Sequence, residues 1–317
     1  MNERYSLGYK VKNVLRVIYT LPFVLASVTG VAFALTIDQQ WLIALLIPLD
    51  VFFLALFVNL SNDYYDHKTG SDQERFAMID QSFAEEVSHK VSRTLYWQGN
   101  SFDRGLISDK GGKILLMAIA IIAVLLAVPI LLYGGWVVLV LGGIAFFLSF
   151  FYTAPPLKLG ARGLGELDVL LSFAMMSFFS FYVIAQQFSW EALIIALTVG
   201  INVMLMRIID EMSGLEAHQK AGEKDLVVRF GIDKVTSIIT GVLVVMYSLC
   251  AVLVAYNITF LLLFLTLPFS VNMIRHLRDQ QDKFHIIRPV LDVLKLATIH
   301  ALLVVIALSM QSVLTFV

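Results

Sequence analysis

Nine long apolar runs make up most of the chain. The connections between them alternate between short ones and longer, polar ones. A helix of roughly 20 mostly apolar residues crosses about 30 Å of hydrocarbon and satisfies its own backbone there. The pattern therefore predicts an all-α integral membrane bundle of nine transmembrane helices. We place these spans at about 14–36, 41–62, 114–133, 136–153, 166–186, 191–209, 236–255, 258–274 and 290–313.

The connections on the two sides of this predicted bundle differ in length and charge. One set is short and holds no Lys or Arg, and it lies at 37–40, 134–135, 187–190 and 256–257. The other set is longer, polar and rich in Lys and Arg, and it lies at 63–113, 154–165, 210–235 and 275–289. By the positive-inside rule, we expect the N-terminus and the long connections in the cytoplasm and the C-terminus outside.

Composition agrees with a multi-pass protein of the cytoplasmic (inner) membrane. Hydrophobic residues make up 59% of the 317 residues and charged residues 15%, against about half and a quarter in soluble domains. The formal net charge of −1 gives no basis for a nucleic-acid partner. The single cysteine, Cys250, excludes an intramolecular disulfide framework. We expect one membrane domain over 1–317, in which the long connection 63–113 could act as a lid.

Acidic residues gather where the second predicted span ends, in the stretch "NLSNDYYDHKTGSD" (59–72). Asn59, Asp63 and Asp66 are spaced i, i+4, i+7, and Asn62 stands beside Asp66, so a helix would present them on one stripe. Carboxylates held this close repel one another unless a cation lies between them, and oxygen ligands suit Mg²⁺. The other interpretation is an ordinary solvated start of a loop.

A second cluster follows the sixth predicted span, in "NVMLMRIIDEMSGLEAHQKAGEKDLVVRFG" (202–231). Asn202 and Arg207 lie within the span, Asp210 and Glu211 at its end, and further polar residues beyond it, namely Glu216, His218, Lys220 and Lys224. Ionisable groups at the edge of a bilayer are functional candidates. We expect the two clusters to converge on Mg²⁺ and a diphosphate. An acid–base network that closes the helix ends, as Glu216 and Lys220 could form, is the alternative.

A third stretch, "YTAPPLKLGARGLGELDV" (152–169), joins the fourth and fifth predicted spans. Its Pro and Gly residues predict a rigid turn with close backbone approach. A turn alone does not explain the basic pair Lys158 and Arg162, which could bind an anion.

These stretches together resemble the UbiA superfamily of intramembrane aromatic prenyltransferases. "NLSNDYYD" is similar to the first acidic motif of that superfamily. The 1,4-dihydroxy-2-naphthoate polyprenyltransferase branch is the most similar, because it shares four further features in order. The first two are Gly70-Ser71-Asp72 and "GNSFDRGLIS" (99–108). The third is "YTAPPLKLGARGLGEL", which is similar to the branch's pattern Y-T-x-x-P…GLG. The fourth is "GEKDLVVRFG" (222–231), which is similar to its pattern G-K-x-T-L-x-V-R-x-G. "RVIYTLPF" (16–23) is a looser match to R-P-x-T-L-P. The resemblance covers roughly 16–313.

The resemblance implies Mg²⁺-dependent transfer of a polyprenyl group from polyprenyl diphosphate to 1,4-dihydroxy-2-naphthoate in menaquinone biosynthesis, at the cytoplasmic face of the bilayer. It implies catalytic and metal-binding roles for Asp63, Asp66 and Asp210, and Glu216 is a further candidate metal ligand. Substrate-binding candidates are Asn59, Asn62, Tyr152, Lys158, Arg162, Asn202, Arg207 and Lys224. Neither donor length nor oligomeric state is predicted.

The second acidic motif departs from the family pattern, which usually has further Asp where this chain has Gly214 and His218. Glu216 or His218 could substitute as ligand or base, or catalysis could be altered or lost. A UbiA-type enzyme with another acceptor therefore stays open, as does a non-catalytic quinone-binding or transport protein. In the last predicted span we expect His300 to be a hydrogen-bonded packing residue, although it could face the aromatic substrate.

Overall fold

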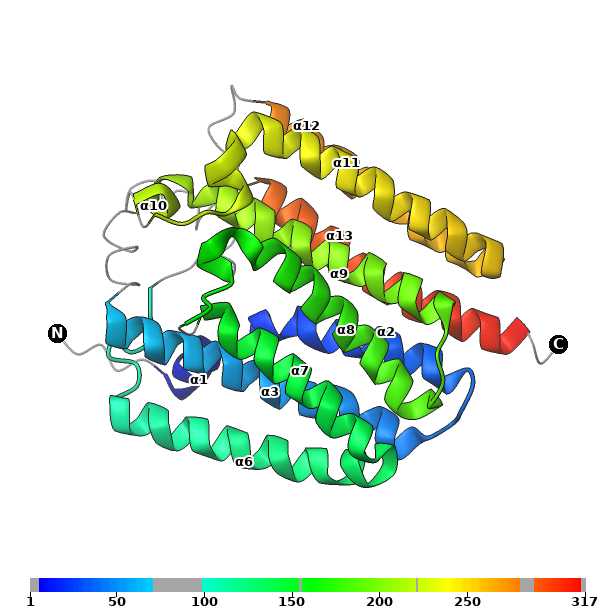
Figure 1. Ribbon diagram of the computed structural model, residues 1–317, viewed down its shortest axis with the longest axis horizontal. Helices are drawn as coiled ribbons and strands as arrows, with labels where there is room; N and C mark the ends of the chain where they lie inside the picture. Colours follow the sequence, from blue (N-terminus) through cyan, green and yellow to red (C-terminus); the bar gives the residue numbers. More distant parts are fainter. Residues whose placement is uncertain (1–5, 71–98, 154–155, 221, 280–287, 315–317) are drawn as a thin grey trace. The chain divides into compact units, whose positions relative to one another are not determined.

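The computed structural model describes residues 6–70, 99–153, 156–220, 222–279 and 288–314. Within these ranges every regular element is a helix, as Figure 1 shows, so the all-α prediction is confirmed there. The helices are α1 (Leu7–Leu15), η1 (Val17–Thr20), α2 (Leu21–Leu35), α3 (Trp41–Thr69), α6 (Asp109–Gly134), α7 (Trp136–Thr153), η2 (Gly160–Leu164), α8 (Gly165–Ala185), α9 (Trp190–Ser213), α10 (Leu215–Lys220), α11 (Leu226–Tyr256), η3 (Ile258–Thr266), α12 (Leu267–Arg278) and α13 (Arg288–Leu314).

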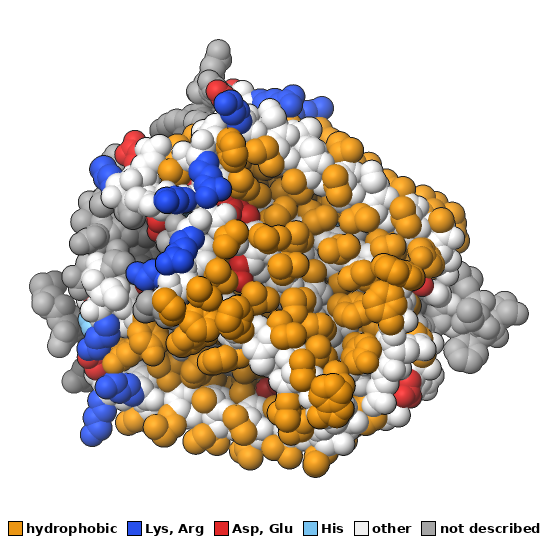
Figure 2. Space-filling view, in the orientation of Figure 1, with side chains coloured by type: hydrophobic (Ala, Val, Ile, Leu, Met, Phe, Trp, Pro, Cys, Tyr) orange, Lys and Arg blue, Asp and Glu red, His pale blue; other side chains and the backbone are white. Residues whose placement is uncertain are grey.

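Eight helical stretches of the described chain are long and apolar enough to cross a membrane. They are Leu7–Leu35, Trp41–Thr69, Asp109–Gly134, Arg162–Ala185, Trp190–Ser213, Leu226–Tyr256, Ile258–Arg278 and Arg288–Ser312. The predicted span 136–153 forms α7, whose apolar stretch Trp136–Tyr152 is shorter. Apolar side chains cover much of the surface in Figure 2, as lipid-facing helices require. The chain is therefore a multi-pass membrane protein, while nine spans and their orientation stay predictions.

Several helices run past the ends that the apolar runs predict. The polar residues 63–69 continue α3, and α6 begins five residues earlier than expected, at Asp109. The first turn of α11 begins at Leu226, and a kink at Gly231, with non-helical φ 74° and ψ 163°, separates it from the rest of the helix. Backbone hydrogen bonds form a helix whether or not its side chains are apolar, so a helix can outlast the hydrophobic run. In the predicted connection 63–113, residues 71–98 lie outside the described residues, and the predicted lid lies there with them.

Contacts within the described chain form two compact units. The first unit comprises Met1–Leu21 and Leu49–Val128, and the second comprises Pro22–Pro48 and Pro129–Val317. In the first unit, the apolar faces of α1, α3 and α6 meet the segment before α6. Its buried core consists of Val14, Leu56, Leu60, Phe102, Leu106 and Ile119. Ser101 donates a hydrogen bond to the Asn13 carbonyl at 3.0 Å, which fastens α1 to that segment.

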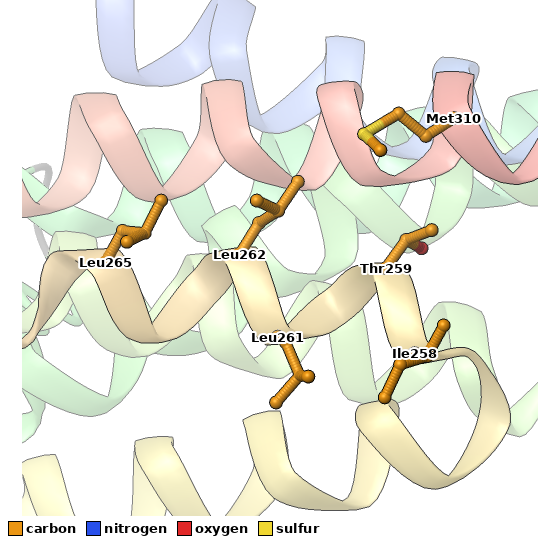
Figure 3. Close-up of a pocket in the computed structure, with 6 residues that line it drawn as sticks. All are labelled: Ile258, Thr259, Leu261, Leu262, Leu265 and Met310. Carbon is orange, nitrogen blue, oxygen red and sulfur yellow. The ribbon is translucent and has the colours of Figure 1, made fainter.

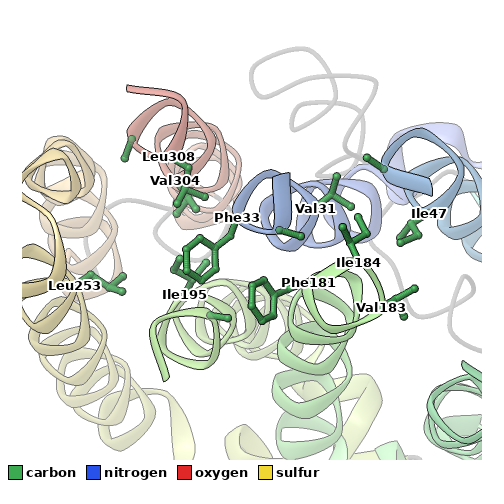
Figure 4. Packing of buried hydrophobic residues seen from close by; sticks show 14 of the residues in the cluster. Val31, Phe33, Ile47, Phe181, Val183, Ile184, Ile195, Leu253, Val304 and Leu308 are labelled. Carbon is green, nitrogen blue, oxygen red and sulfur yellow. The ribbon is translucent and has the colours of Figure 1, made fainter. Parts of the chain in front are cut away.

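The second unit is built around α8 and α9, which run side by side, with α13 along the other side of α9 (Figure 1). Figure 4 shows the largest buried cluster, in which Phe33 of α2 stacks on Phe181 of α8 with ring centroids 5.0 Å apart. Because lipid tails are as apolar as these side chains, close van der Waals packing, and not transfer out of water, holds such helices together. This packing fixes the helices whose ends carry the second acidic cluster.

Gly30 lets α2 approach α8 closely. A Cβ added at Gly30 would lie 1.8 Å from the carbonyl oxygen of Ser177. One residue earlier, the Thr29 hydroxyl lies 2.9 Å from the Ser177 hydroxyl, so a buried hydrogen bond joins the same two helices. Any side chain at position 30 would therefore separate them.

Candidate functional site

The four residues of the first acidic cluster lie in the last three turns of α3, in the first unit. Asp63 is buried, with 2% of its surface exposed, and Asn59, Asn62 and Asp66 are half-buried. The helix continues through all four, so their spacing places Asn59, Asp63 and Asp66 on one stripe, as expected. A buried carboxylate at a helix end requires a charged or hydrogen-bonding partner.

That partner is Arg16, which sequence analysis did not single out. Arg16 Nη1 lies 2.7 Å from Asp63 Oδ1, and the guanidinium carbon lies 4.4 Å from the ring centroid of Tyr19. Arg16 stands between α1 and η1 with φ 48° and ψ 43°, the left-handed region that non-glycine residues seldom adopt. The backbone is held in a costly conformation at the residue whose side chain reaches Asp63.

A second group of charges closes the end of α3. His67 Nδ1 lies 2.5 Å from Asp103 Oδ1, and Lys68 forms an ion pair with Asp109 at the start of α6. The His67 ring also stacks on Phe102, with centroids 5.6 Å apart. Asn100 Nδ2 donates to the Asp63 carbonyl at 2.7 Å. The segment 99–108 therefore braces the helix turn that carries the acidic stripe.

In the second unit, the end of α9 brings Arg207, Asp210 and Glu211 together. Arg207 Nε lies 2.7 Å from Glu211 Oε1, without the alignment of a hydrogen bond, and Nη1 lies 3.7 Å from Asp210 Oδ2. Glu211 is fully buried, whereas the Asp210 side chain is 57% exposed. The Arg207 guanidinium carbon is 5.9 Å from the ring centroid of Tyr152, within range of a cation–π contact. Three predicted site residues, Tyr152, Arg207 and Asp210, are thus neighbours.

The basic stretch between α7 and α8 meets the tail of the second cluster at Gly163. A Cβ added there would lie 2.2 Å from the Lys224 carbonyl oxygen and 2.8 Å from Arg229 Nη2, and Gly163 has φ 79°. Glu166, which sequence analysis passed over, accepts a hydrogen bond from the Leu226 amide at 2.6 Å. These contacts hold the turn that carries Arg162 against the loop that carries Lys224.

The remaining predicted substrate-binding residues differ in their surroundings. Lys158, Arg162 and Lys224 are exposed, and Arg162 donates to the Pro156 carbonyl at 2.9 Å. Asn202 is buried within α9, where its amide donates to the Thr198 carbonyl at 2.9 Å. The three exposed cations can reach an anion in solvent, whereas Asn202 serves the interior of the helix bundle.

His218, at the end of α10, contacts two carboxylates. Its Nδ1 lies 2.8 Å from Glu223 Oε2 and 2.7 Å from Asp225 Oδ2. The hydrogen bond to Glu223 is the largest influence and raises the pKa of His218 above its ordinary value, against burial, which lowers it. Among the described His, Cys, Asp and Glu side chains, this is the one group of three whose ligand atoms lie within 4.8 Å of one another. Glu216 is exposed on α10 and is not part of it.

The first cluster has the donor chemistry of a magnesium site. Asp63 and Asp66 offer carboxylate oxygens and Asn59 and Asn62 offer amide oxygens, which are the hard donors that Mg²⁺ takes. Asp63 already has a cationic group, the Arg16 guanidinium, at 2.7 Å. The residues present therefore fit a divalent cation that takes oxygen ligands.

An apolar pocket of the second unit lies between η3 and α13 (Figure 3). It is lined by Ile258, Thr259, Leu261, Leu262, Leu265 and Met310. The one hydroxyl in this lining, that of Thr259, donates to Asn257 Oδ1 at 2.8 Å. The pocket thus offers apolar contact and no ionisable group, so it does not belong to the polar cluster at the end of α9.

Comparisons with known proteins agree with the motifs. The model of the UbiA prenyltransferase family matches residues 21–299. The chain is 28% identical over 270 residues to 2-carboxy-1,4-naphthoquinone phytyltransferase of Synechocystis sp., covering 84% of this chain and 81% of that one. It is 27% identical over 265 residues to 1,4-dihydroxy-2-naphthoate octaprenyltransferase of Haemophilus influenzae, covering 78% and 79%.

A solved structure shares the fold. The UbiA homologue of Archaeoglobus fulgidus bound to GPP and Mg²⁺ superposes with a TM-score of 0.63 at 17% identity, covering 93% of this chain and 99% of that one. Because the family model spans most of the sequence, including both acidic clusters, the chain belongs to the UbiA prenyltransferase family and is an enzyme that transfers prenyl groups.

Proposed function

We propose that this enzyme transfers a polyprenyl group from polyprenyl diphosphate to 1,4-dihydroxy-2-naphthoate, in the presence of Mg²⁺, in menaquinone biosynthesis. The observation that carries the proposal is the stripe Asn59, Asp63 and Asp66 on α3, with Asp63 buried and facing a cation. The naphthoate and naphthoquinone acceptors in the names of its relatives support the choice of acceptor.

The reaction is an electrophilic substitution. The bond between the allylic carbon and the diphosphate oxygen breaks, and diphosphate leaves with the electron pair. An electron-rich ring carbon of the naphthalenediol forms a bond to the allylic cation, and the ring becomes aromatic again after it has lost its carboxyl group as carbon dioxide and a proton to solvent. When bound, Mg²⁺ would neutralise the diphosphate charge. Asp63, Asp66 and Asp210 would hold the metal, and Asn59 and Asn62 would orient it or the diphosphate.

Basic residues would bind the leaving diphosphate. Arg207 is held in place by Glu211 and packs over Tyr152, so its guanidinium is preorganised for an anion. Lys158, Arg162 and Lys224 are exposed and can contribute charge as the substrate enters. In this proposal the clusters of α3 and α9 serve one diphosphate at the cytoplasmic face of a single nine-span domain; their convergence stays a prediction.

The test is a prenyl-transfer assay on protein purified in detergent, with polyprenyl diphosphate, a panel of aromatic acceptors, and either Mg²⁺ or a chelator. We expect product with the naphthoate only when metal is present. Asp63→Asn, Asp66→Asn and Asp210→Asn should each lose about 100-fold or more, as happens when one preorganised charge-stabilising group is removed. Asp233→Asn, an exposed carboxylate in α11, is the matched control and should keep its activity.

The outcomes separate the proposal from its alternatives. Reaction with another aromatic acceptor and none with the naphthoate would replace the acceptor and keep the enzyme class. Unchanged turnover in both Asp63→Asn and Asp66→Asn would defeat the role of the first cluster. Tight quinone binding with no turnover on any acceptor would favour a non-catalytic quinone-binding protein.

A further inference from the structure

We propose that His218, Glu223 and Asp225 bind a divalent transition-metal ion, for which Mn²⁺ is the natural probe, with a ligand set different from that of the proposed magnesium site. All three residues belong to the second unit, where α10 lies next to the start of α11 (Figure 1). The inference does not depend on which prenyl acceptor the enzyme uses.

The ligand atoms are already close to the geometry that a metal requires. Ligand atoms about 2.0–2.2 Å from a metal lie roughly 3–3.5 Å from one another. Here the Nδ1 of His218 is 2.8 Å from Glu223 Oε2 and 2.7 Å from Asp225 Oδ2, and the three atoms lie within 4.8 Å. The two nitrogen–oxygen distances would need to lengthen to about 3 Å or more to admit an ion, and the proton between imidazole and carboxylate would be released.

The local backbone holds these side chains in place. Asp225 is fully buried and is the N-cap of α11, where its other oxygen, Oδ1, accepts from the Val228 amide at 2.8 Å. The Glu223 amide donates to the His218 carbonyl at 3.0 Å, across a turn in which Gly222 has φ 70°. The cap and the turn orient two of the three ligands before any ion arrives.

Gly214 provides the space for the third ligand. A Cβ at this position would lie 2.8 Å from His218 Nε2, so the imidazole packs directly on the glycine backbone and points Nδ1 at the carboxylates. The residues at which this chain departs from the family pattern therefore lie next to one another. The family usually has Asp at 214 and 218, and its G-K-x-T-L pattern has Lys and Thr where this chain has Glu223 and Asp225.

The donor set selects the kind of metal. One imidazole nitrogen with two carboxylate oxygens suits Mn²⁺, Fe²⁺ or Zn²⁺, whereas Mg²⁺ prefers oxygen ligands alone. Two carboxylates and a neutral imidazole carry a charge of −2, which a divalent ion balances. The site therefore differs in chemistry from the oxygen donors of α3, and excess Mg²⁺ should not displace its ion.

The experiment uses the full chain in detergent, treated with chelator and then titrated with Mn²⁺ in excess Mg²⁺, which fills oxygen-only sites. Electron paramagnetic resonance counts the bound Mn²⁺, and electron spin-echo modulation detects a coordinated ¹⁴N. We expect one Mg²⁺-resistant Mn²⁺ per chain with a ¹⁴N coupling. His218→Asn should abolish that coupling and weaken Mn²⁺ binding at least tenfold, the lower end of the loss caused by removing even an outer-shell partner.

Asp225→Asn keeps a good helix N-cap, so it should fold and still bind Mn²⁺ at least tenfold more weakly. Gln219→Ala, an exposed neighbour on α10, should bind like the parent chain. Asp63→Asn should also keep the ion although it loses prenyl transfer, which separates this inference from the proposed function. Absence of a Mg²⁺-resistant Mn²⁺ in the parent chain, or parental affinity in both His218→Asn and Asp225→Asn, would overturn the proposal.

Discussion

Arg16 Nη1 lies 2.7 Å from Asp63 Oδ1, joining the end of α1 to the buried carboxylate of α3 across 47 residues of sequence. The Asp63 side chain is 3% exposed and that of Arg16 is 26% exposed. The ion pair therefore supplies a counter-charge for Asp63 from within the chain. Under the proposed function, Asp63 would therefore serve both Arg16 and the metal.

Replacing Arg16 by Met should lower the free energy of unfolding by about 1–3 kcal/mol, because Asp63 loses its partner while Arg16 itself is partly exposed. Thermal unfolding in detergent measures this. Lys12→Met, an exposed basic residue on α1, is the matched control and should change stability by less than about 0.5 kcal/mol. Mg²⁺ should raise the melting temperature of Arg16→Met more than that of the parent chain. Equal losses in the two variants would contradict a role for the ion pair.

Gly163→Ala should be among the most destabilising small substitutions in the second unit. Its Cβ would lie 2.2 Å from the Lys224 carbonyl oxygen, a backbone atom, and its φ of 79° disfavours a side chain. We expect a loss of about 1–3 kcal/mol or more from overpacking, seen as a lower melting temperature and yield. Gly241→Ala in α11, where a Cβ meets nothing within 4 Å, should be neutral or slightly stabilising. Similar behaviour of the two variants would exclude close packing at Gly163.

Variants of Arg207 and Glu211 can distinguish an effect on stability from an effect on prenyl transfer. Glu211 is fully buried, so Arg207→Met leaves an unpaired carboxylate and should cost about 3–5 kcal/mol. The double variant Arg207→Met/Glu211→Met removes both charges and should recover most of that stability. Prenyl transfer should stay low in the double variant, because the diphosphate still lacks Arg207. Recovery of activity together with stability would assign Arg207 a purely structural role.

Much of the helical fold could be predicted from the length of the apolar runs, because a helix that crosses a bilayer needs roughly 20 mostly apolar residues. The stripe of Asn59, Asp63 and Asp66 could also be predicted, because residues three and four apart lie on one face of a helix. The family followed from the order of four motifs. Neither run length nor local spacing indicates which polar residues meet across long separations in sequence.

The partners that sequence analysis missed show this limit. Arg16 is 47 residues from Asp63, and Glu166 is 60 residues from the Leu226 amide that it binds. Neither pairing has a signal in local spacing. For His218 and Asp225 a local signal does exist, because the glycine at 222 favours the turn that folds one toward the other, and the departures from the family motif marked the place.

The structure confirms the prediction that His300 is a hydrogen-bonded packing residue, and measurements of thermal stability can test that bond. Its Nε2 lies 3.0 Å from the Thr198 hydroxyl, which donates to the Ile195 carbonyl at 2.8 Å and therefore accepts from His300. Thr198→Val leaves a buried N–H without its partner and should cost about 1–3 kcal/mol in thermal unfolding.

Thr240→Val is the matched control, since that half-buried hydroxyl bonds only within its own helix, to the Thr236 carbonyl. Adding His300→Phe to Thr198→Val should cost less than the sum of the two single losses, because the bond can be lost only once. Additive losses would show that the two side chains do not share a hydrogen bond.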